Sequence, residues 1–486
     1  MINYLVAKYK IKTENAIYWV IGCFLLMLVA NEAYIIPLTH DELSTIDISQ
    51  NTIFEIISYA DPIPNNHILN TLLLKLNIAI FGEHLFTDRL HNVLSFIPFF
   101  IFTILLAKLL FKDNWLRMAF VCLIILQPFL LDFYTVTRGY GLSVAFQMVS
   151  LFYFFKRIKY NEGRYLTYAI LFAAIGVYAN FTLLNYYIPL GFLLGVHTIL
   201  TYKKEGKEKV FKAIGVLTLV SLFLGALCYL PFFKMMSTKQ FVYWGTTSFL
   251  TDTVKQLIIS LRSGVEYFNW SNEIVYMLVL SFISLVILLG IIFYKKQQNA
   301  RIFIYALGLL LLVILYNNMQ FYLVQVPFLH ARTALFFIPM VSICVCLGMD
   351  AVTQRNRLAG LLMTIFTISF SLQHFIRGFN NSLVFEWYYD ANTHEVLRDI
   401  DELIKNENLN TPVKLDCYWI FHPSLSYHIS HKYKGVIELI PYHKELEINE
   451  EARYYYIQSD QQEQLTQKFE KIKDYSAGNR VLMKAK

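Results

Sequence analysis

Two adjacent carboxylates, Asp41 and Glu42, follow the first long apolar stretch of the chain and are preceded by Thr39 and His40. A carboxylate at the edge of an apolar segment can remove a proton from an acceptor hydroxyl, or it can hold a divalent cation. Partial burial would raise its pKa and make it a stronger base. The same residues would also fit a solvated acidic pair at a helix end, so both interpretations stay open.

Two arginines lie in otherwise weakly charged surroundings. Arg138 precedes Gly139 and Tyr140, and Arg332 follows His330, in each case near the start of an apolar stretch. A guanidinium grips phosphate oxygens through two parallel hydrogen bonds. The pair therefore favours a shared anionic ligand, with lipid headgroup contact as the alternative for either arginine alone.

Three further residues are weaker candidates for substrate binding. His67 could bind a phosphate or act as an acid, or it could belong to a polar loop that starts a helix. Asp88 and Arg89 open the second apolar stretch, where a structural ion pair is the favoured interpretation. The triplet Asn180-Phe181-Thr182 matches the glycosylation pattern, but such short matches arise mostly by chance.

The elements that must position these residues are apolar. Hydrophobic residues make up 56% of the 486 residues and charged residues only 16%, whereas soluble chains are nearer a quarter charged. We expect an α-helical polytopic membrane protein with about eleven transmembrane helices, each long enough for the ~30 Å hydrocarbon core. The predicted spans are 16–38, 84–111, 116–134, 139–157, 164–180, 182–201, 209–233, 272–294, 299–318, 328–349 and 357–376.

The loop charges predict an orientation. With a cytoplasmic N-terminus, the loops on the cytoplasmic side all contain Lys or Arg, at 112–117, 156–164, 203–212, 295–301 and 355–357. This pattern follows the positive-inside rule, and it places the C-terminal region outside. The composition is poor in Gly and rich in Ile, Lys, Asn and Tyr, which suggests a bacterial inner membrane with the C-terminal region in the periplasm.

Two domains are expected, a transmembrane domain over 1–380 and a small soluble α/β domain over 385–486. Outer loops at 39–83 and 234–271 belong to the first domain, and 39–83 is expected to hold surface helices at Thr52–Ala60 and Ile68–Phe81. In the tail, strands and helices alternate. Helices are predicted at His394–Asn406, Pro423–Lys432 and Gln461–Lys471, and strands at Pro412–Ile420, Val436–Ile440, Tyr454–Gln458 and Arg480–Lys484.

The order of these features resembles the GT-C membrane glycosyltransferases, and most closely the aminoarabinose transferases and protein O-mannosyltransferases. The resemblance covers about 15–375 and rests on four stretches in order: Asp41-Glu42 after the first span, an apolar helix ending in Phe81-Gly82, Asp88-Arg89-Leu90, and Thr137-Arg138-Gly139-Tyr140-Gly141.

The resemblance implies a glycosyltransferase whose donor is a sugar on a polyprenyl phosphate, used on the outer face with inversion. It makes Asp41 the general base or acceptor-binding carboxylate, with Glu42 assisting, and it places the lipid phosphate on Arg138 and Arg332. Asp88, Arg89, His67 and Tyr140 would belong to the substrate-binding region. The acceptor, a lipid, glycan or protein, stays open, as does a divalent cation at Asp41 and Glu42.

One departure from the family is visible in the first outer loop. Many relatives have Lys-Pro-Pro where this chain has Asn65-Asn66-His67. The change removes a lysine that could bind phosphate, so either His67 substitutes for it or the donor differs.

The alternatives are a glycan polymerase or ligase, a secondary transporter without glycosyl transfer, and a non-catalytic assembly protein. The spans show no internal repeat, and the polar residues cluster at the outer surface, whereas transporter sites lie near the midplane. The chain contains no Gly-rich phosphate loop, no HExxH and no paired CxxC, and no nucleic-acid partner is expected.

Overall fold

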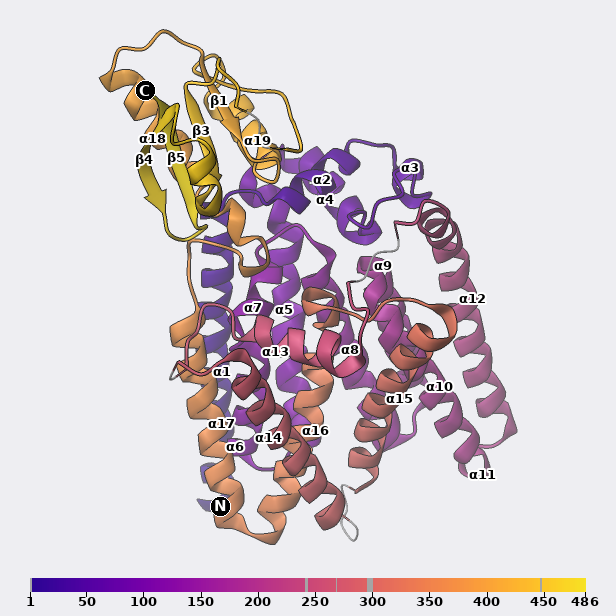
Figure 1. The fold of residues 1–486 in the computed structure, drawn as a ribbon. Coiled ribbons are helices and arrows are strands. Elements are labelled where there is room, and N and C mark those ends of the chain that lie inside the picture. Colours follow the sequence, from indigo (N-terminus) through magenta and orange to yellow (C-terminus); the bar gives the residue numbers. More distant parts are fainter. Residues whose placement is uncertain (1, 241–243, 268, 295–299, 446–447) are drawn as a thin grey trace.

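The computed structural model describes residues 2–240, 244–267, 269–294, 300–445 and 448–486. Long helices form a bundle, and a small α/β domain lies on one end of it (Figure 1). The N-terminus lies at the opposite end of the molecule from the C-terminus.

The bundle confirms a helix within each predicted span. Its long helices are α1 (Ile2–Ile35), α5 (Leu85–Leu110), α6 (Asn114–Ile125), α8 (Gly139–Tyr160), α9 (Gly163–Ala179), α10 (Leu184–Leu200), α12 (Lys207–Ser237), α14 (Asn272–Phe293), α15 (Ala300–Val324), α16 (Phe337–Arg355) and α17 (Arg357–Gly378). The predicted basic loop at 295–301 falls largely outside the described residues.

Within the described residues, eight helices are long and apolar enough to cross a membrane, or nine if one bent pair counts as a single span. The bent pair is α6 with the short turns α7 (Pro128–Leu131) and η1 (Asp132–Tyr134), which meet at 62°. The predicted span over 116–134 is therefore present as a helix that is broken at residues 126 and 127. A residue before proline is pushed out of the helical region, and Gln127 has extended backbone angles of −112° and 101°.

Helix α8 lies at the centre of the bundle, packed between α5 and α9. Its side chains are buried on all sides along most of its length. The buried side-chain amide of Gln147 on α8 donates a 2.8 Å hydrogen bond to the Phe336 carbonyl. This bond ties α8 to the start of α16, so the segments that precede these two helices are held at the same end of the bundle.

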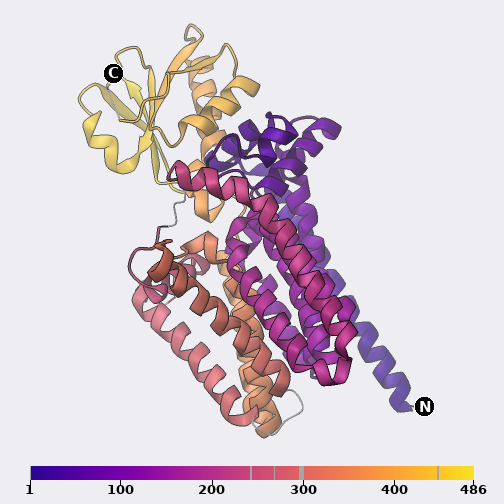
Figure 2. The same ribbon diagram turned by 90° about the vertical axis from the view of Figure 1, so that its right-hand side faces the viewer.

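The first outer loop folds into α2 (His40–Ser49), α3 (Ile53–Ile57) and α4 (Ile68–Phe81), which lie above the ends of the long helices (Figure 2). Helix α4 matches its prediction, whereas the predicted helix over 52–60 is shorter. Helix α2 was not predicted. The second outer loop contains η3 (Phe249–Lys255) and α13 (Gln256–Leu261).

The C-terminal domain is the predicted α/β layer. A short segment, η6 (Phe385–Asp390), leads into it, followed by α18 (Thr393–Asn406), β1 (Val413–Cys417), α19 (His422–Lys432), β2 (Ile437–Leu439), β3 (Tyr454–Gln458), η7 (Ser459–Gln464), β4 (Phe469–Tyr475) and β5 (Arg480–Ala485). The sheet order is β2-β1-β3-β5-β4, with β1 parallel to both neighbours and the last three strands antiparallel.

The helix predicted at Gln461–Lys471 is wrong. Its first part is the turn η7, and its last residues open β4, which pairs with β5 from Phe469 to Tyr475. Leu465 is the one apolar side chain of 461–468 and is buried. A helix over this segment would have no second apolar residue with which to pack against the domain. Pairing with β5 satisfies the backbone instead, because tertiary contacts override weak local propensity.

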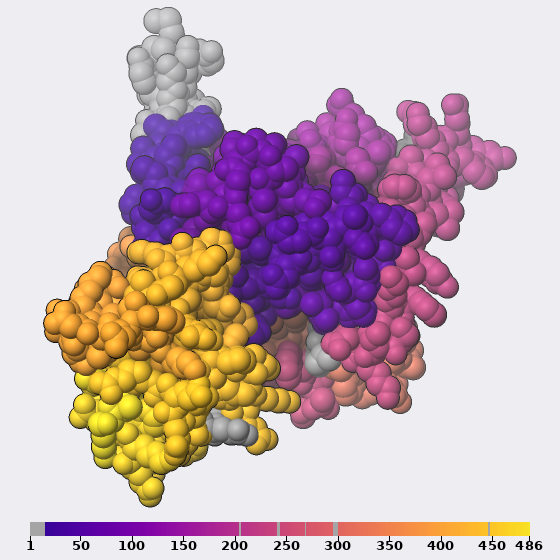
Figure 3. All heavy atoms as spheres, turned by 90° about the horizontal axis from the view of Figure 1, so that it is seen from above, coloured from indigo at the N-terminus to yellow at the C-terminus, as the bar shows by residue number. Residues whose placement is uncertain are grey.

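The C-terminal domain and the outer-loop helices cover the same end of the molecule side by side (Figure 3). Ser424 of α19 donates a 2.8 Å hydrogen bond to the Leu38 carbonyl. The backbone N–H of His40 donates to Asp390 Oδ2 at 2.8 Å. The domain thus packs directly on the loop that begins with the Asp41–Glu42 pair.

Candidate active site

A cavity of about 430 Å³ lies at this end of the bundle. Its walls come from the first outer loop, the starts of α8 and α10, the end of α12, the segment before α16 and η6. The lining residues are Tyr59, Pro64, Asn65, Asn66, His67, Arg138, Tyr140, Asn180, Phe181, Thr182, Met235, Gln240, Trp244, His330, Arg332, Thr333, Glu386 and Tyr389.

Asp41 joins the two predicted arginines. Its Oδ2 lies 3.6 Å from Arg138 Nη2 and 3.3 Å from Arg332 Nη2. Burial by itself raises the pKa of Asp41, but the two guanidiniums outweigh it and hold this pKa below its usual value. The expectation of a raised pKa and a stronger base is therefore wrong, and Asp41 is an ionised carboxylate between two cations.

Arg138 is held from several sides at the N-cap of α8. Its Nη1 donates to Thr45 Oγ1 at 2.9 Å, and its Nη2 donates to Asn65 Oδ1 at 3.1 Å. The side chain is almost fully buried, and its Nε has no hydrogen-bond partner among the described residues. The first outer loop thus fixes the Arg138 guanidinium in the cavity wall.

Arg332 is the more accessible of the two, with a side chain that is 25% exposed. It lies on the short turn η5 (Ala331–Ala334). Its Nη1 donates to Glu386 Oε1 at 2.5 Å, and its Nε donates to the Tyr140 hydroxyl at 3.3 Å. The guanidinium also lies over the Trp387 ring, 5.0 Å from its centre. Arg332 therefore presents positive charge to the cavity.

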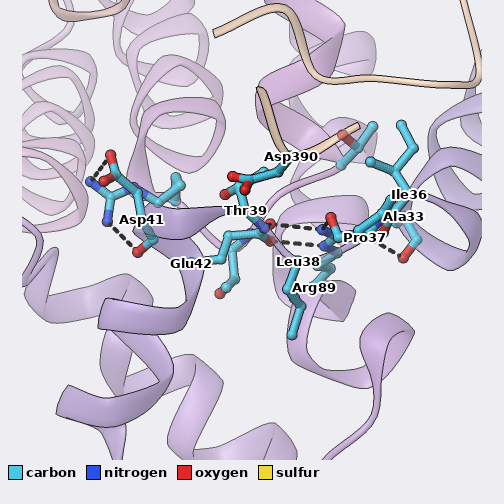
Figure 4. Close-up of polar contacts among 12 residues, drawn as sticks. Ala33, Ile36, Pro37, Leu38, Thr39, Asp41, Glu42, Arg89 and Asp390 are labelled. Carbon is cyan, nitrogen blue, oxygen red and sulfur yellow. Dashed lines mark hydrogen bonds and ion pairs between the residues drawn. The ribbon is translucent and has the colours of Figure 1, made fainter. Parts of the chain in front are cut away.

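Glu42 has a different environment from Asp41, and the two side chains point away from one another (Figure 4). Arg89 grips Glu42 through two hydrogen bonds of 2.8 and 2.7 Å, and both side chains are completely buried. The Arg89 guanidinium also donates to the carbonyls of Ala33, Ile36 and Pro37. This pair fastens the end of α1 to α5, and neither member lines the cavity.

The peptide of Thr137, next to Arg138, is held at both ends. Glu42 Oε1 accepts its N–H at 2.7 Å, and Asn70 Nδ2 donates to its carbonyl at 3.1 Å. The buried pair of Glu42 and Arg89 therefore sets the backbone from which Arg138 extends, although it lies away from the cavity itself.

His67 lines the cavity at the start of α4, with its ring edge-on to Tyr140 at 5.2 Å. Burial, together with Arg138 and Arg332, holds the pKa of His67 well below its usual value. The imidazole is thus neutral at neutral pH and can exchange hydrogen bonds with a ligand. Asp88 lies instead at the start of α5, buried, where it accepts the His84 N–H at 3.4 Å.

The structure therefore brings Asp41, His67, Arg138, Tyr140 and Arg332 together, and it leaves Glu42, Asp88 and Arg89 outside the cavity. Sequence reasoning missed Asn180, and it missed Glu386 and Tyr389 of η6. The available signal for η6 was the run of aromatic and acidic residues over 385–390, where the composition changes.

The site does not fit a divalent cation at Asp41 and Glu42. The two carboxylates diverge, and each is already paired with arginine. Within the described ranges, no three His, Cys, Asp or Glu side chains gather as metal ligands.

Comparison with known proteins yields a match in fold. No protein-family model matches the chain, and no curated protein sequence does. The crystal structure of apo ArnT from Cupriavidus metallidurans superposes with a TM-score of 0.50 at 9% identity, covering 96% of this chain and 98% of that one. The chain shares the fold of ArnT.

A second ArnT structure, bound to undecaprenyl phosphate, gives a TM-score of 0.49 at 10% identity and covers 96% of this chain and 97% of that one. The match to apo ArnT runs through the bundle and the C-terminal domain alike, since it spans nearly both whole chains. The match to apo ArnT confirms the expected fold of a helical polytopic membrane protein with a small C-terminal domain.

Proposed function

We propose that this protein is a membrane glycosyltransferase that takes its sugar from a polyprenyl-phosphate donor. The observation that carries the proposal is the pair Arg138 and Arg332, which come from distant parts of the chain and line one cavity at the end of an apolar bundle. The fold shared with apo ArnT supports the same class.

The cavity suits a phosphate. Besides the two guanidiniums, α4 and α8 both begin at cavity residues, His67 and Arg138, and neither helix has a side-chain cap there. Helix N-termini carry partial positive charge and free N–H groups, which favour bound anions. Arg332 is the primary phosphate ligand in this proposal, because its side chain is partly exposed whereas that of Arg138 is almost fully buried.

A polyprenyl chain has an apolar path beside the cavity. Met235 of α12 lines the cavity, and further along the same helix Phe233, Tyr229 and Phe223 are exposed on its surface. Exposed apolar side chains on a helix long enough to span the bilayer face hydrocarbon. The lipid tail therefore lies along the bundle while its phosphate stays at the cavity.

In the proposed reaction, an acceptor oxygen attacks the anomeric carbon opposite the phosphate, and the configuration inverts. The bond from carbon to the phosphate oxygen breaks, and its electron pair leaves with the phosphate. Arg332 and Arg138 stabilise the charge that develops there. Asp41 orients both guanidiniums and receives the acceptor proton, which demands little basicity when the transition state resembles an oxocarbenium ion.

We place this chemistry on the outer face of a bacterial inner membrane, with the C-terminal domain in the periplasm. The acceptor is a lipid, a glycan or a protein. A polymerase or ligase would share the outer arginines and the lipid-linked sugar, but it has no need of Asp41.

The test measures consumption of polyprenyl-phosphate sugars by purified protein in bilayers. Arg332→Gln should slow consumption by about two orders of magnitude, the usual loss for an oxyanion ligand. Arg164→Gln, an exposed arginine on α9 far from the cavity residues, is the control and should leave the rate unchanged. Wild-type protein that consumes no lipid-linked sugar would contradict the proposal, and equal rates in Asp41→Asn would favour the polymerase.

A further inference from the structure

Three helices meet at Gly139. A Cβ atom on this glycine would lie 1.9 Å from the Ala179 carbonyl oxygen and 3.0 Å from His67 Cβ. The start of α8, the end of α9 and the start of α4 are therefore in direct contact. Arg138 and Asn180, the sequence neighbours of Gly139 and Ala179, both line the cavity.

The orientation of the Asn180 amide is determined by its surroundings. Asn180 Oδ1 accepts the backbone N–H of Thr182 at 2.9 Å and the Thr182 hydroxyl at 2.8 Å. Because a backbone N–H can only donate, the oxygen must face Thr182 and the NH₂ group must face the other way.

That NH₂ group has no partner among the described residues. Asn180 is only 2% exposed, and it lines the cavity. Native proteins pair nearly all of their buried donors, because an unmade hydrogen bond at a buried site is costly. The two N–H bonds of Asn180 thus point to an oxygen acceptor supplied by a ligand.

The wall around Asn180 differs from the arginine wall. Tyr59 and Phe181 line the cavity with their ring centres 6.1 Å apart. Binding sites for neutral polar molecules combine such apolar rings with a few oriented hydrogen-bonding groups. A phosphate is drawn to guanidinium charge, whereas neutral amide donors beside aromatic rings suit the hydroxyl groups and apolar face of a sugar.

We propose that Asn180, with Tyr59 and Phe181, forms the subsite for the sugar of the donor. Asn180 Nδ2 donates to a sugar oxygen while the adjoining phosphate lies on Arg332 and Arg138. This inference rests on the proposed glycosyltransferase function, and it assigns the sugar to a specific side of the cavity.

The NH₂ group of Asn180 can be removed while an acceptor for the Thr182 N–H is kept. Asn180→Ser removes the NH₂ donors and retains a hydroxyl that can accept the Thr182 N–H. Asn180→Thr, which likewise lacks the NH₂ donors and keeps a hydroxyl acceptor, is the second variant if serine loosens the turn. Asn185→Ser is the matched control, because its amide donates to the Thr182 carbonyl and lies outside the cavity lining.

The experiment measures equilibrium binding in lipid nanodiscs with two probes. One is undecaprenyl phosphate, and the other is the tightest-binding member of a panel of undecaprenyl-phosphate pentosides and hexosides. Asn180→Ser should weaken binding of the sugar-bearing probe by about tenfold, which corresponds to the loss of one good hydrogen bond. It should change binding of the bare phosphate by less than twofold, and Asn185→Ser should change neither.

Equal weakening of both probes would overturn the subsite, since it would place Asn180 on the phosphate or on the fold. Unchanged binding of both probes would overturn it as well, as would wild-type protein that binds no glycoside more tightly than the bare phosphate. In these cases wild-type protein still binds a probe, so the proposed function survives. Wild-type protein that binds neither probe would overturn both.

Discussion

Arg89 and Glu42 form a fully buried ion pair with two parallel hydrogen bonds of 2.8 and 2.7 Å. The Arg89 guanidinium also donates hydrogen bonds to the carbonyls of Ala33, Ile36 and Pro37. The Glu42 carboxylate also accepts hydrogen bonds from the backbone N–H groups of Thr39 and Thr137. Such complete pairing offsets the cost of removing two charges from water. The pair therefore supports the site from outside the cavity lining.

Removing one partner of this pair should be strongly destabilising. We expect Glu42→Ala to lower the free energy of unfolding by about 3–5 kcal/mol, because Arg89 would remain charged and buried. Thermal unfolding in detergent measures the effect. Asp47→Ala, on the same helix, is the control and should change the midpoint little. A stable Glu42→Ala protein with lost turnover would instead indicate a catalytic role for Glu42.

Asp41 predicts a pH dependence of stability. Its folded pKa lies below its usual value of 3.8, so its ion pairs stabilise the protein above the unfolded pKa and are lost as the pH falls through the folded pKa. The stability difference between wild type and Asp41→Asn should be constant above about pH 5 and shrink below about pH 4. Thermal midpoints of both proteins from pH 3 to 8 test this. A difference that grows toward low pH would contradict the pairing.

Gly139 is required by close approach rather than by backbone angles. We expect Gly139→Ala to destabilise the protein by about 1–3 kcal/mol or more, since its Cβ would clash with the backbone oxygen of Ala179. Donor binding should weaken too, because the clash would shift the backbone next to the cavity residues Arg138 and Asn180. Gly225→Ala on α12 is the control: no described heavy atom outside its own helix lies within 4 Å of the added Cβ, and the change should stabilise by up to about 1 kcal/mol.

In the proposed function, Glu386 and the donor phosphate compete for Arg332. The 2.5 Å contact between them occupies one edge of the guanidinium. We expect Glu386→Gln to tighten binding of undecaprenyl phosphate by about tenfold. The phosphate then no longer has to displace the charge-assisted hydrogen bond between Arg332 and Glu386. Glu407→Gln, which disrupts a pair with Lys484 in the C-terminal domain, should have no effect. Weaker binding in Glu386→Gln would show that Glu386 positions Arg332 for the ligand.

The orientation predicted from the loop charges can be tested by labelling. In a chain whose six cysteines are replaced, a cysteine at Glu463, exposed in the C-terminal domain, should react with an impermeant reagent in intact cells. A cysteine at Asn356, exposed between α16 and α17, should react only after lysis. The reverse result would invert the orientation and move the cavity to the cytoplasmic side.

Local patterns were sufficient for most elements. Apolar stretches of about 20 residues identify membrane helices, because the bilayer is a uniform apolar solvent. The amphipathic spacing of 394–406 and the strand at Tyr454–Gln458 were likewise readable from the chain. The edge strand β4 was not, because its stability comes from hydrogen bonds to β5 rather than from its own residues.

The sequence by itself determined the fold class and the residue types of the site: a helical membrane protein with arginines and a carboxylate pair at one end. Only the tertiary structure decided their roles. Asp41 and Glu42 are adjacent in sequence, but neighbouring residues on a helix do not share a face. Asp41 therefore contacts the two cavity arginines, whereas Glu42 forms the buried ion pair with Arg89. The partners Arg332, Glu386 and Asn180 approach the cavity from distant segments, and no local pattern encodes a contact made only when the helices pack.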